Sequence, residues 1–166
     1  MTIRSPWLRK AASITAAASL AAVSLAVAAT PASAQEPDGT ITGVTSPQGL
    51  AVNPVGAGLG NLYVAGSRGS TVSVVEPGHT SPTPSMEITG LNHPRAVAFD
   101  STGLLYIANA FASNVLVYDV STPTSPSLVR TLTGVSTPFG VAVDSTGTVF
   151  ASSGLDSTVM VFEAGA

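Results

Sequence analysis

The stretch Pro94-Arg-Ala-Val-Ala-Phe-Asp100 decides the fold, because the chain contains it three times in related form. The other copies are Pro47-Gln-Gly-Leu-Ala-Val-Asn53 and Pro138-Phe-Gly-Val-Ala-Val-Asp144, so the three prolines lie 47 and then 44 residues apart. Self-similarity at such a period is typical of stacked or radial repeats, in which one unit cannot bury its own apolar faces. The sequence therefore predicts a fold built of three similar units.

Each copy is accompanied by three further short apolar segments. The expected second strands are 62–65, 105–108 and 149–152, the third strands are about 71–75, 114–119 and 158–162, and the fourth strands are 40–43, 87–90 and 131–134. These segments are rich in β-branched and aromatic residues and are bounded by Gly, Pro, Asn, Asp and Ser, as short strands are. In the turns after the first strands, Asp100 and Asp144 are expected to accept backbone N–H bonds. The pattern predicts an all-β protein with four strands in each unit.

Four strands in a unit of roughly 40–50 residues describe a β-propeller blade. The motif Pro-x-Gly/Ala-hydrophobic-Ala-hydrophobic-Asp/Asn, followed by Gly-x-hydrophobic-Tyr-hydrophobic-Ala, resembles the blades of NHL and YncE-like propellers over residues 38–163. A more distant resemblance is to gluconolactonase-like propellers. The resemblance implies three blades, at about 38–83, 84–126 and 127–166. WD-repeat and kelch blades are disfavoured because they rely on tryptophan. The single tryptophan of this sequence, Trp7, lies before the three repeats and belongs to none of them.

Three blades make only part of a propeller, since closed rings have about four to eight blades. The repeat pattern begins with a fourth-type strand and ends after a third-type strand, so the last blade lacks its outer strand and residues 40–43 supply a spare one. Two explanations are compatible with this pattern. Either two chains associate head to tail as a homodimer that forms a six-blade ring, each spare strand completing the partner's last blade, or the sequence is a truncated propeller.

Residues 1–34 have the features of an export signal. A basic start precedes an uncharged run over residues 11–29, and Ala32-Ser-Ala34 fits cleavage before Gln35. The alternative is a membrane anchor, because the apolar run is nearly long enough to span a bilayer. Its Ala, Ser and Thr content favours cleavage, which predicts a secreted, periplasmic or otherwise extracytoplasmic protein consisting of residues 35–166 that does not bind a membrane.

The charge of residues 35–166 excludes two classes of partner. Only Arg68, Arg95 and Arg130 remain against nine carboxylates, so no basic stripe is present for nucleic acid or for an anionic membrane. The chain also has no cysteine, so packing and hydrogen bonds rather than disulfides must stabilise the exported domain.

Ligands of propellers bind at the mouth of the central channel, which is formed by the loops that lead into the inner strands and by the loops between the second and third strands. The corresponding positions, predicted as ligand-binding residues, are Gln48, His93, Arg95, Asn109, Phe139 and Ser153. Arg95, close to His93, is the candidate for holding an anionic group such as a carboxylate or phosphate. The alternative is a set of solvated loops without a ligand.

The sequence offers no clear catalytic constellation. Gly-x-Ser-x-Gly is absent, and His79 and His93 lack the spacing and partners of a zinc site. We therefore expect no catalytic residue, no metal site and no cofactor. The predicted role is non-catalytic binding or scaffolding, with a protein, a glycan or a small molecule as partner. The alternatives are a metal-dependent lactonase or other small-molecule hydrolase of the gluconolactonase type, for which Asn109 is one candidate ligand, and a nonfunctional fragment.

Overall fold

The computed structural model describes residues 37–165, and the expected export signal lies outside the described residues. The chain divides into a unit of residues 1–39 and a unit of residues 40–166, and the fold below is that of the second unit. Within residues 37–165, no helix is long and apolar enough to cross a membrane. The elements are β1 (Pro47–Val52), β2 (Leu62–Gly66), β3 (Thr71–Val75), the 3-10 turn η1 (Pro84–Met86), β4 (Pro94–Phe99), β5 (Leu104–Asn109), the 3-10 turn η2 (Ala110–Ala112), β6 (Asn114–Asp119), β7 (Ser127–Leu132), β8 (Pro138–Val143), β9 (Val149–Ser153) and β10 (Thr158–Phe162).

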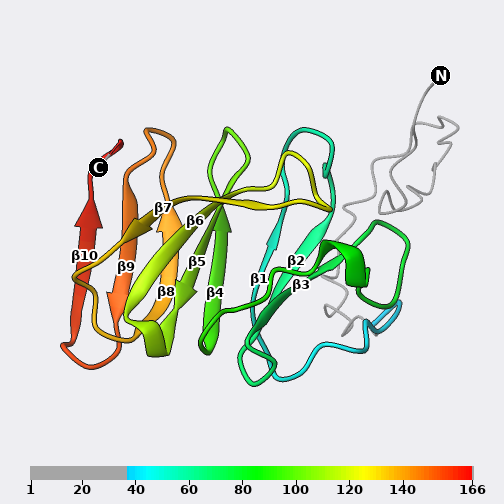
Figure 1. Ribbon diagram of the computed structural model, residues 1–166, viewed down its shortest axis with the longest axis horizontal. Helices are drawn as coiled ribbons and strands as arrows, with labels where there is room; N and C mark the ends of the chain where they lie inside the picture. Colours follow the sequence, from blue (N-terminus) through cyan, green and yellow to red (C-terminus); the bar gives the residue numbers. More distant parts are fainter. Residues whose placement is uncertain (1–36, 166) are drawn as a thin grey trace, which may run out of the picture. The chain divides into compact units, whose positions relative to one another are not determined.

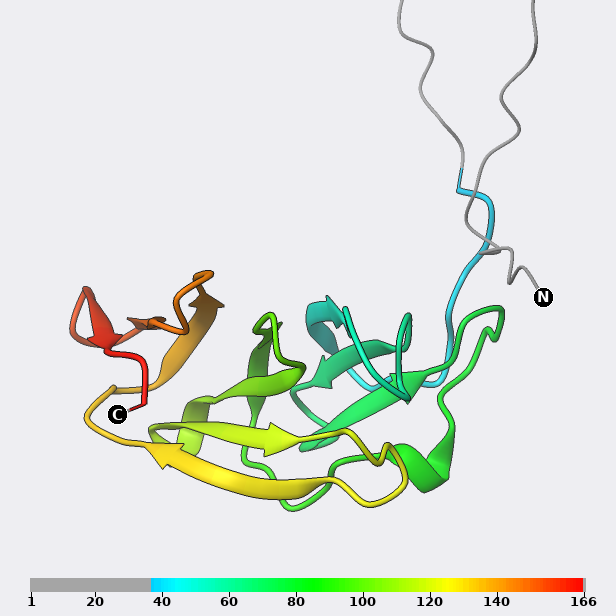
Figure 2. The same ribbon diagram turned by 90° about the horizontal axis from the view of Figure 1, so that it is seen from above.

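The strands form three antiparallel sheets that follow one another along the chain. The first sheet has the order β1-β2-β3, the middle sheet β4-β5-β6-β7 and the last sheet β8-β9-β10 (Figure 1). The first strand of each sheet is its inner strand, and β4 contacts both β1 and β8 (Figure 2). The prediction of an all-β protein built of three repeated antiparallel units is confirmed.

Each repeat has the same β-sheet register shift next to the proline that begins its motif. The pairing of the inner strand with the second strand shifts register between Pro47 and Leu50, between Pro94 and Ala96, and at the corresponding place in the last sheet. Proline has no N–H to donate to a ladder and is therefore tolerated at a strand end or a bulge. The proline thus marks the point where the loop of one unit enters its inner strand.

The hydrophobic core lies between the sheets. We call the face of a sheet that packs on the next sheet along the chain its back face, and the opposite face its front face. One cluster joins the back face of the first sheet to the front face of the middle sheet. Its buried members are Tyr63, Ala65, Val72, Val74, Ile88, Leu91, Val97, Leu105, Ile107 and Val120. A second cluster joins the back face of the middle sheet to the front face of the last; its members are Tyr106, Val115, Val117, Val149 and Ala151, with Leu132 and Val135.

The inner strands approach each other most closely between the first and middle sheets. A Cβ atom added at Gly49 would lie 2.6 Å from the Cα of Ala96 and 2.8 Å from the carbonyl oxygen of Arg95. Contacts that short with backbone atoms leave no room for a side chain, so glycine at this position lets β1 and β4 lie side by side.

The turns after the inner strands form as predicted in the middle and last sheets. Oδ1 of Asp100 accepts hydrogen bonds from the backbone N–H groups of Thr102 (2.8 Å) and Leu104 (3.0 Å). Asp144 does the same for Thr146 and Thr148, at the same two distances. In the first sheet this position is Asn53, which accepts a bond from the N–H of Val55 instead.

The outer strands differ from the sequence prediction: among the described residues, only the middle sheet has a full fourth strand. That strand, β7, begins four residues earlier than the predicted 131–134 and pairs with β6, so residues 127–132 complete the middle sheet although the predicted repeat bounds put them in the third unit. The predicted strand 87–90 is reduced to one bridge between Ile88 and Val72. The turn η1 begins at Pro84, and the N–H of Glu87 after it donates to the carbonyl of Pro84 at 3.4 Å instead of to a neighbouring strand.

The predicted strand over residues 40–43 was wrong. These residues form no strand in the structure, and the N–H of Thr42 donates to the carbonyl of Thr80 in the connection after β3. The segment therefore runs beside a loop of its own chain. Within the described residues, β10 pairs only with β9 and forms the outer edge of the last sheet.

Candidate functional site

The loops that lead into β1, β4 and β8 meet the second-to-third-strand turns at one edge of the sheets. The backbone N–H groups of Ser67, Ala110 and Gly154 donate to residues directly before the three prolines. Those acceptors are Ser46, His93 and Thr137, and all three have a positive φ, between 46° and 52°. Because the strained conformation repeats in every copy, it belongs to the architecture of this edge and not to one ligand site.

Two of the predicted site residues are held within this loop framework. The side-chain oxygen of Asn109 accepts a hydrogen bond from the N–H of Asn92 (2.6 Å), and its amide nitrogen donates to Asn114 (3.2 Å). Oγ of Ser153 donates to the carbonyl of Ser136 (2.7 Å), with Oδ2 of Asp156 at 3.0 Å. Both residues are buried. Their polar atoms therefore fix the loops, and neither side chain is directed toward a ligand by these contacts.

Arg95 and Phe139 come together across the boundary between the middle and last sheets. The guanidinium carbon of Arg95 lies 4.2 Å from the centre of the Phe139 ring, which is a cation–π distance. The ring in turn fits against Gly154, where a Cβ atom would lie 2.7 Å from it. Glycine at position 154 thus makes room for Phe139, and Phe139 supports Arg95.

Arg95 has no anion to balance its charge among the residues that the structure describes. Its Nε atom is buried and makes no hydrogen bond there, and no carboxylate forms an ion pair with it. A guanidinium group presents five N–H donors, and partly buried charges are usually paired. Arg95 is therefore a cationic group with unused donors at the predicted mouth.

His93 and Phe111 form a second aromatic pair beside it. Their rings stack with centres 4.2 Å apart and planes 14° from parallel. Phe111 lies in η2, which is held by hydrogen bonds from Ala110 and Phe111 to His93 and Asn92 and which lies against β4 and β8. Phe111 is exposed, and so is Phe139. The sequence analysis missed Phe111. The signal that could have identified it is that only this repeat has an aromatic residue in the turn between the second and third strands.

Gln48, the residue of the first repeat that corresponds to Arg95, lies exposed on β1. The mouth is therefore asymmetric, because the middle and last sheets supply Arg95, Phe139, His93 and Phe111, whereas the first sheet supplies an uncharged side chain.

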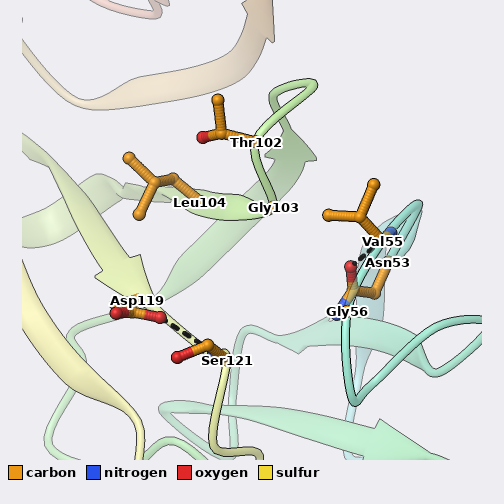
Figure 3. A pocket seen from close by; sticks show the side chains of 8 residues that line it. All are labelled: Asn53, Val55, Gly56, Thr102, Gly103, Leu104, Asp119 and Ser121. Atoms are coloured by element: carbon orange, nitrogen blue, oxygen red, sulfur yellow. Dashed lines mark hydrogen bonds between the residues drawn. The ribbon is translucent and has the colours of Figure 1, made fainter.

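A cavity lies at the opposite ends of the strands, away from the predicted residues. It has a volume of about 220 Å³ and lies between the glycine-rich turn after β1 and the turn between β4 and β5 (Figure 3). Its polar groups already have internal partners, since Asn53 accepts from Val55 and Asp119 accepts from the N–H of Ser121 at 2.8 Å. Hydrogen bonds from the backbone and then the side chain of Ser121 lower the pKa of Asp119 below its usual value. The cavity therefore holds turns in place and offers few free groups.

Within residues 37–165, no three His, Asp or Glu side chains lie together in a way that would hold a metal ion. Asp100 and Asp144, the aspartates that accept the hydrogen bonds of the hairpin turns, have a structural role instead of a metal-binding one. Burial raises the pKa of Asp100, but hydrogen bonds from Thr102, Leu104 and Tyr106 outweigh that effect and lower it overall. The pKa of Asp144 is lowered first by its bond from the Thr146 hydroxyl and then by backbone N–H groups. Both carboxylates therefore stabilise hairpin turns.

Comparison with known proteins identifies the fold. No family model and no curated protein matches this sequence. Among solved structures, it is similar to hydrazine synthase of Kuenenia stuttgartiensis, with a TM-score of 0.61, 21% identity, and coverage of 79% of this chain and 37% of that one. It is also similar to the WD40 β-propeller domain of Doa1, with a TM-score of 0.57, 16% identity, and coverage of 70% of this chain and 36% of that one.

A putative 6-phosphogluconolactonase from Bacteroides fragilis has the same arrangement, with a TM-score of 0.59, 16% identity, and coverage of 72% of this chain and 35% of that one. The chain thus spans well under half the length of the solved structures that it matches. At these identities the likeness concerns the fold alone. The three sheets are blades of a partial β-propeller, as predicted.

Proposed function

We propose that this protein is an exported, non-catalytic binding protein that holds a small organic anion at the mouth formed by the middle and last blades. The observation that carries the proposal is Arg95, whose guanidinium rests on Phe139 and has unused donors. Phe111 and Phe139 both present exposed rings, and the ring of Phe139 is in contact with this cation. An anion with an apolar or flat part would gain charge-assisted hydrogen bonds and ring contacts together.

We also propose that the blades belong to the NHL and YncE-like group, on the strength of the three proline-containing motifs. The export step is proposed from residues 1–34. Mass spectrometry of the protein recovered from the medium or periplasm of an exporting host tests it. A mass beginning at Gln35 supports export with cleavage, and an intact N-terminus contradicts it.

Binding is tested by titration calorimetry with phenyl phosphate, a probe that carries both an anionic group and a flat apolar ring. Arg95→Ala should weaken binding about tenfold or more, because hydrogen bonds to charged groups contribute roughly 1.5–3 kcal/mol. Phe139→Ala should weaken it less, since it removes only the ring contact and the support of Arg95. Arg68→Ala is the matched control: it removes the same charge from an exposed turn at the same edge.

Equal losses in Arg95→Ala and Arg68→Ala would show that only overall charge attracts the probe, and unchanged affinity in Arg95→Ala would remove Arg95 from the site. The lactonase alternative is tested in the same preparation by following hydrolysis of 6-phosphogluconolactone with and without added Ca²⁺. Turnover well above the uncatalysed rate would replace the non-catalytic proposal.

A further inference from the structure

The chain contains the same sheet-to-sheet interface twice. In each case the back face of one blade covers the front face of the next, through the two hydrophobic clusters described above. A specific contact shows the geometry: the ring of Tyr63 on the back face of the first blade meets Phe99 on the front face of the middle blade, edge to face, with centres 5.1 Å apart. The position of a residue in the repeat therefore tells whether it belongs to the back-face half or the front-face half of this interface, in each of the three blades.

The last blade carries the back half of this interface without a cover. Phe150, Val159 and Val161 correspond to Tyr106, Val115 and Val117 of the middle blade. The three residues of the middle blade are fully buried, whereas the exposed fraction of Val161 is 53% and that of Val159 is 60%. The last blade thus presents an apolar surface whose counterpart in both other blades is the core.

The first blade carries the front half. Leu50 and Val52 correspond to Val97 and Phe99 of the middle blade, which face the preceding sheet. The exposed fraction of Leu50 is 63% and that of Val52 is 56%. The outer part of the same face is already covered, since Val64 and Val75 are buried. The open part of the front face is therefore a strip along the inner strand β1.

We propose that these two surfaces bind each other between two copies of the chain, the back face of the last blade in one copy packing on β1 of the other. The occupant is a second copy because each copy carries both halves of one interface, and the exposed residues named above for the two halves are all apolar. By analogy with the Tyr63–Phe99 contact, Phe150 of one copy packs against Val52 of the other. Two copies then close a head-to-tail ring of six blades, within the size range of known propellers.

The experiment measures the mass of the purified protein by gel filtration with light scattering over a concentration series. The wild type should have twice the mass of one chain. Leu50→Asp and Val161→Asp should each raise the dimer dissociation constant about a hundredfold, because each places a charge in an apolar contact. Val129→Asp is the matched control, since Val129 lies on β7 away from both surfaces and has an exposed fraction of 56%. It should remain a dimer, and circular dichroism should show that all three variants are folded.

A mixture of the two disruptive variants gives the sharpest test. The Leu50→Asp chain keeps an intact back face and the Val161→Asp chain keeps an intact front face, so the mixture should regain dimers through one interface although each variant alone does not. A monomeric wild type at every concentration would overturn the proposal, and so would growth beyond two copies. Loss of dimers in Val161→Asp but not in Leu50→Asp would show a back-to-back contact and would also overturn it.

Discussion

The middle blade and the last blade share the same repeat pattern but have opposite surroundings on their back faces. Val117 of the middle blade is completely buried, while Val161, at the same repeat position, has an exposed fraction of 53%. The blades also differ at their outer edges: in the middle blade β7 covers the edge of β6, whereas β10 pairs with β9 alone among the described strands. The comparison shows that the repeat specifies two apolar faces for every blade, whether or not this chain supplies the neighbour.

The largest effect is expected from truncating the same residue on the two faces. Val117→Ala should lower the free energy of unfolding by about 2–3 kcal/mol, because it leaves a cavity between two blades. Val161→Ala should lower it by less than about 0.5 kcal/mol in dilute protein, because solvent replaces the lost methyl groups. Urea unfolding at low protein concentration measures both.

Two outcomes of this experiment inform the comparison. Similar losses in both variants at low concentration would mean that the last blade's back face is covered within one chain. A loss for Val161→Ala that grows with protein concentration would instead indicate cover by a second copy. Val129→Ala on β7 serves as the exposed control, since Val129 is exposed to nearly the same extent.

A smaller effect is expected where the inner strands meet. Gly49→Ala should cost about 2 kcal/mol, because its new Cβ atom would collide with backbone atoms of β4 that cannot move independently. Gly140 has the equivalent position in the last blade, and a Cβ atom there would meet only the side-chain oxygen of Ser152, at 3.1 Å. Gly140→Ala should therefore cost less than about 1 kcal/mol. Equal costs in urea unfolding would show that blade spacing does not depend on Gly49.

The first three strands of each repeat were predictable from sequence because each has its own local signals. The prolines mark the strand starts. Asp-Ser-Thr-Gly turns mark the ends of the first strands in the second and third repeats, and Asn53 with a glycine-rich turn does so in the first. The fourth strands were not predictable, because their pairing depends on where a long connection returns to the sheet. Thr131–Gly134 and Thr40–Gly43 have similar sequences, yet the first overlaps β7 and the second lies beside Thr80.

The candidate site was predictable in position but not in its contacts. The repeat placed Arg95 and Phe139 at equivalent points of two blades, and the distance between neighbouring inner strands is what brings the guanidinium onto the ring. The same repeat placed Asn109 and Ser153 at the mouth, where the loops use their polar atoms. No local pattern in the sequence distinguishes a side chain that holds a loop from one that stays free.

The smallest effect is expected at a pair of tyrosines, where the first and middle blades differ. The hydroxyl of Tyr106 donates to Asp100 Oδ2 at 3.1 Å, whereas the buried hydroxyl of Tyr63 has no partner among the described residues. Tyr106→Phe should therefore cost about 1 kcal/mol, and Tyr63→Phe should be neutral or slightly stabilising. The last blade already has Phe150 at this position, so the repeat accommodates the ring without the hydroxyl.

Alkaline unfolding provides a second measurement on Tyr63. Burial raises its pKa from 10.0 to about 12, so the folded state favours the neutral hydroxyl. Its contribution to stability is complete below pH 10 and is lost as the pH rises toward 12, because the unfolded chain ionises first. Tyr63→Phe should flatten the fall in stability across this interval, with Tyr106→Phe measured beside it at the same pH values. An unchanged slope in Tyr63→Phe would mean that its hydroxyl finds a partner in solution, and the contrast between the two blades at this position would then disappear.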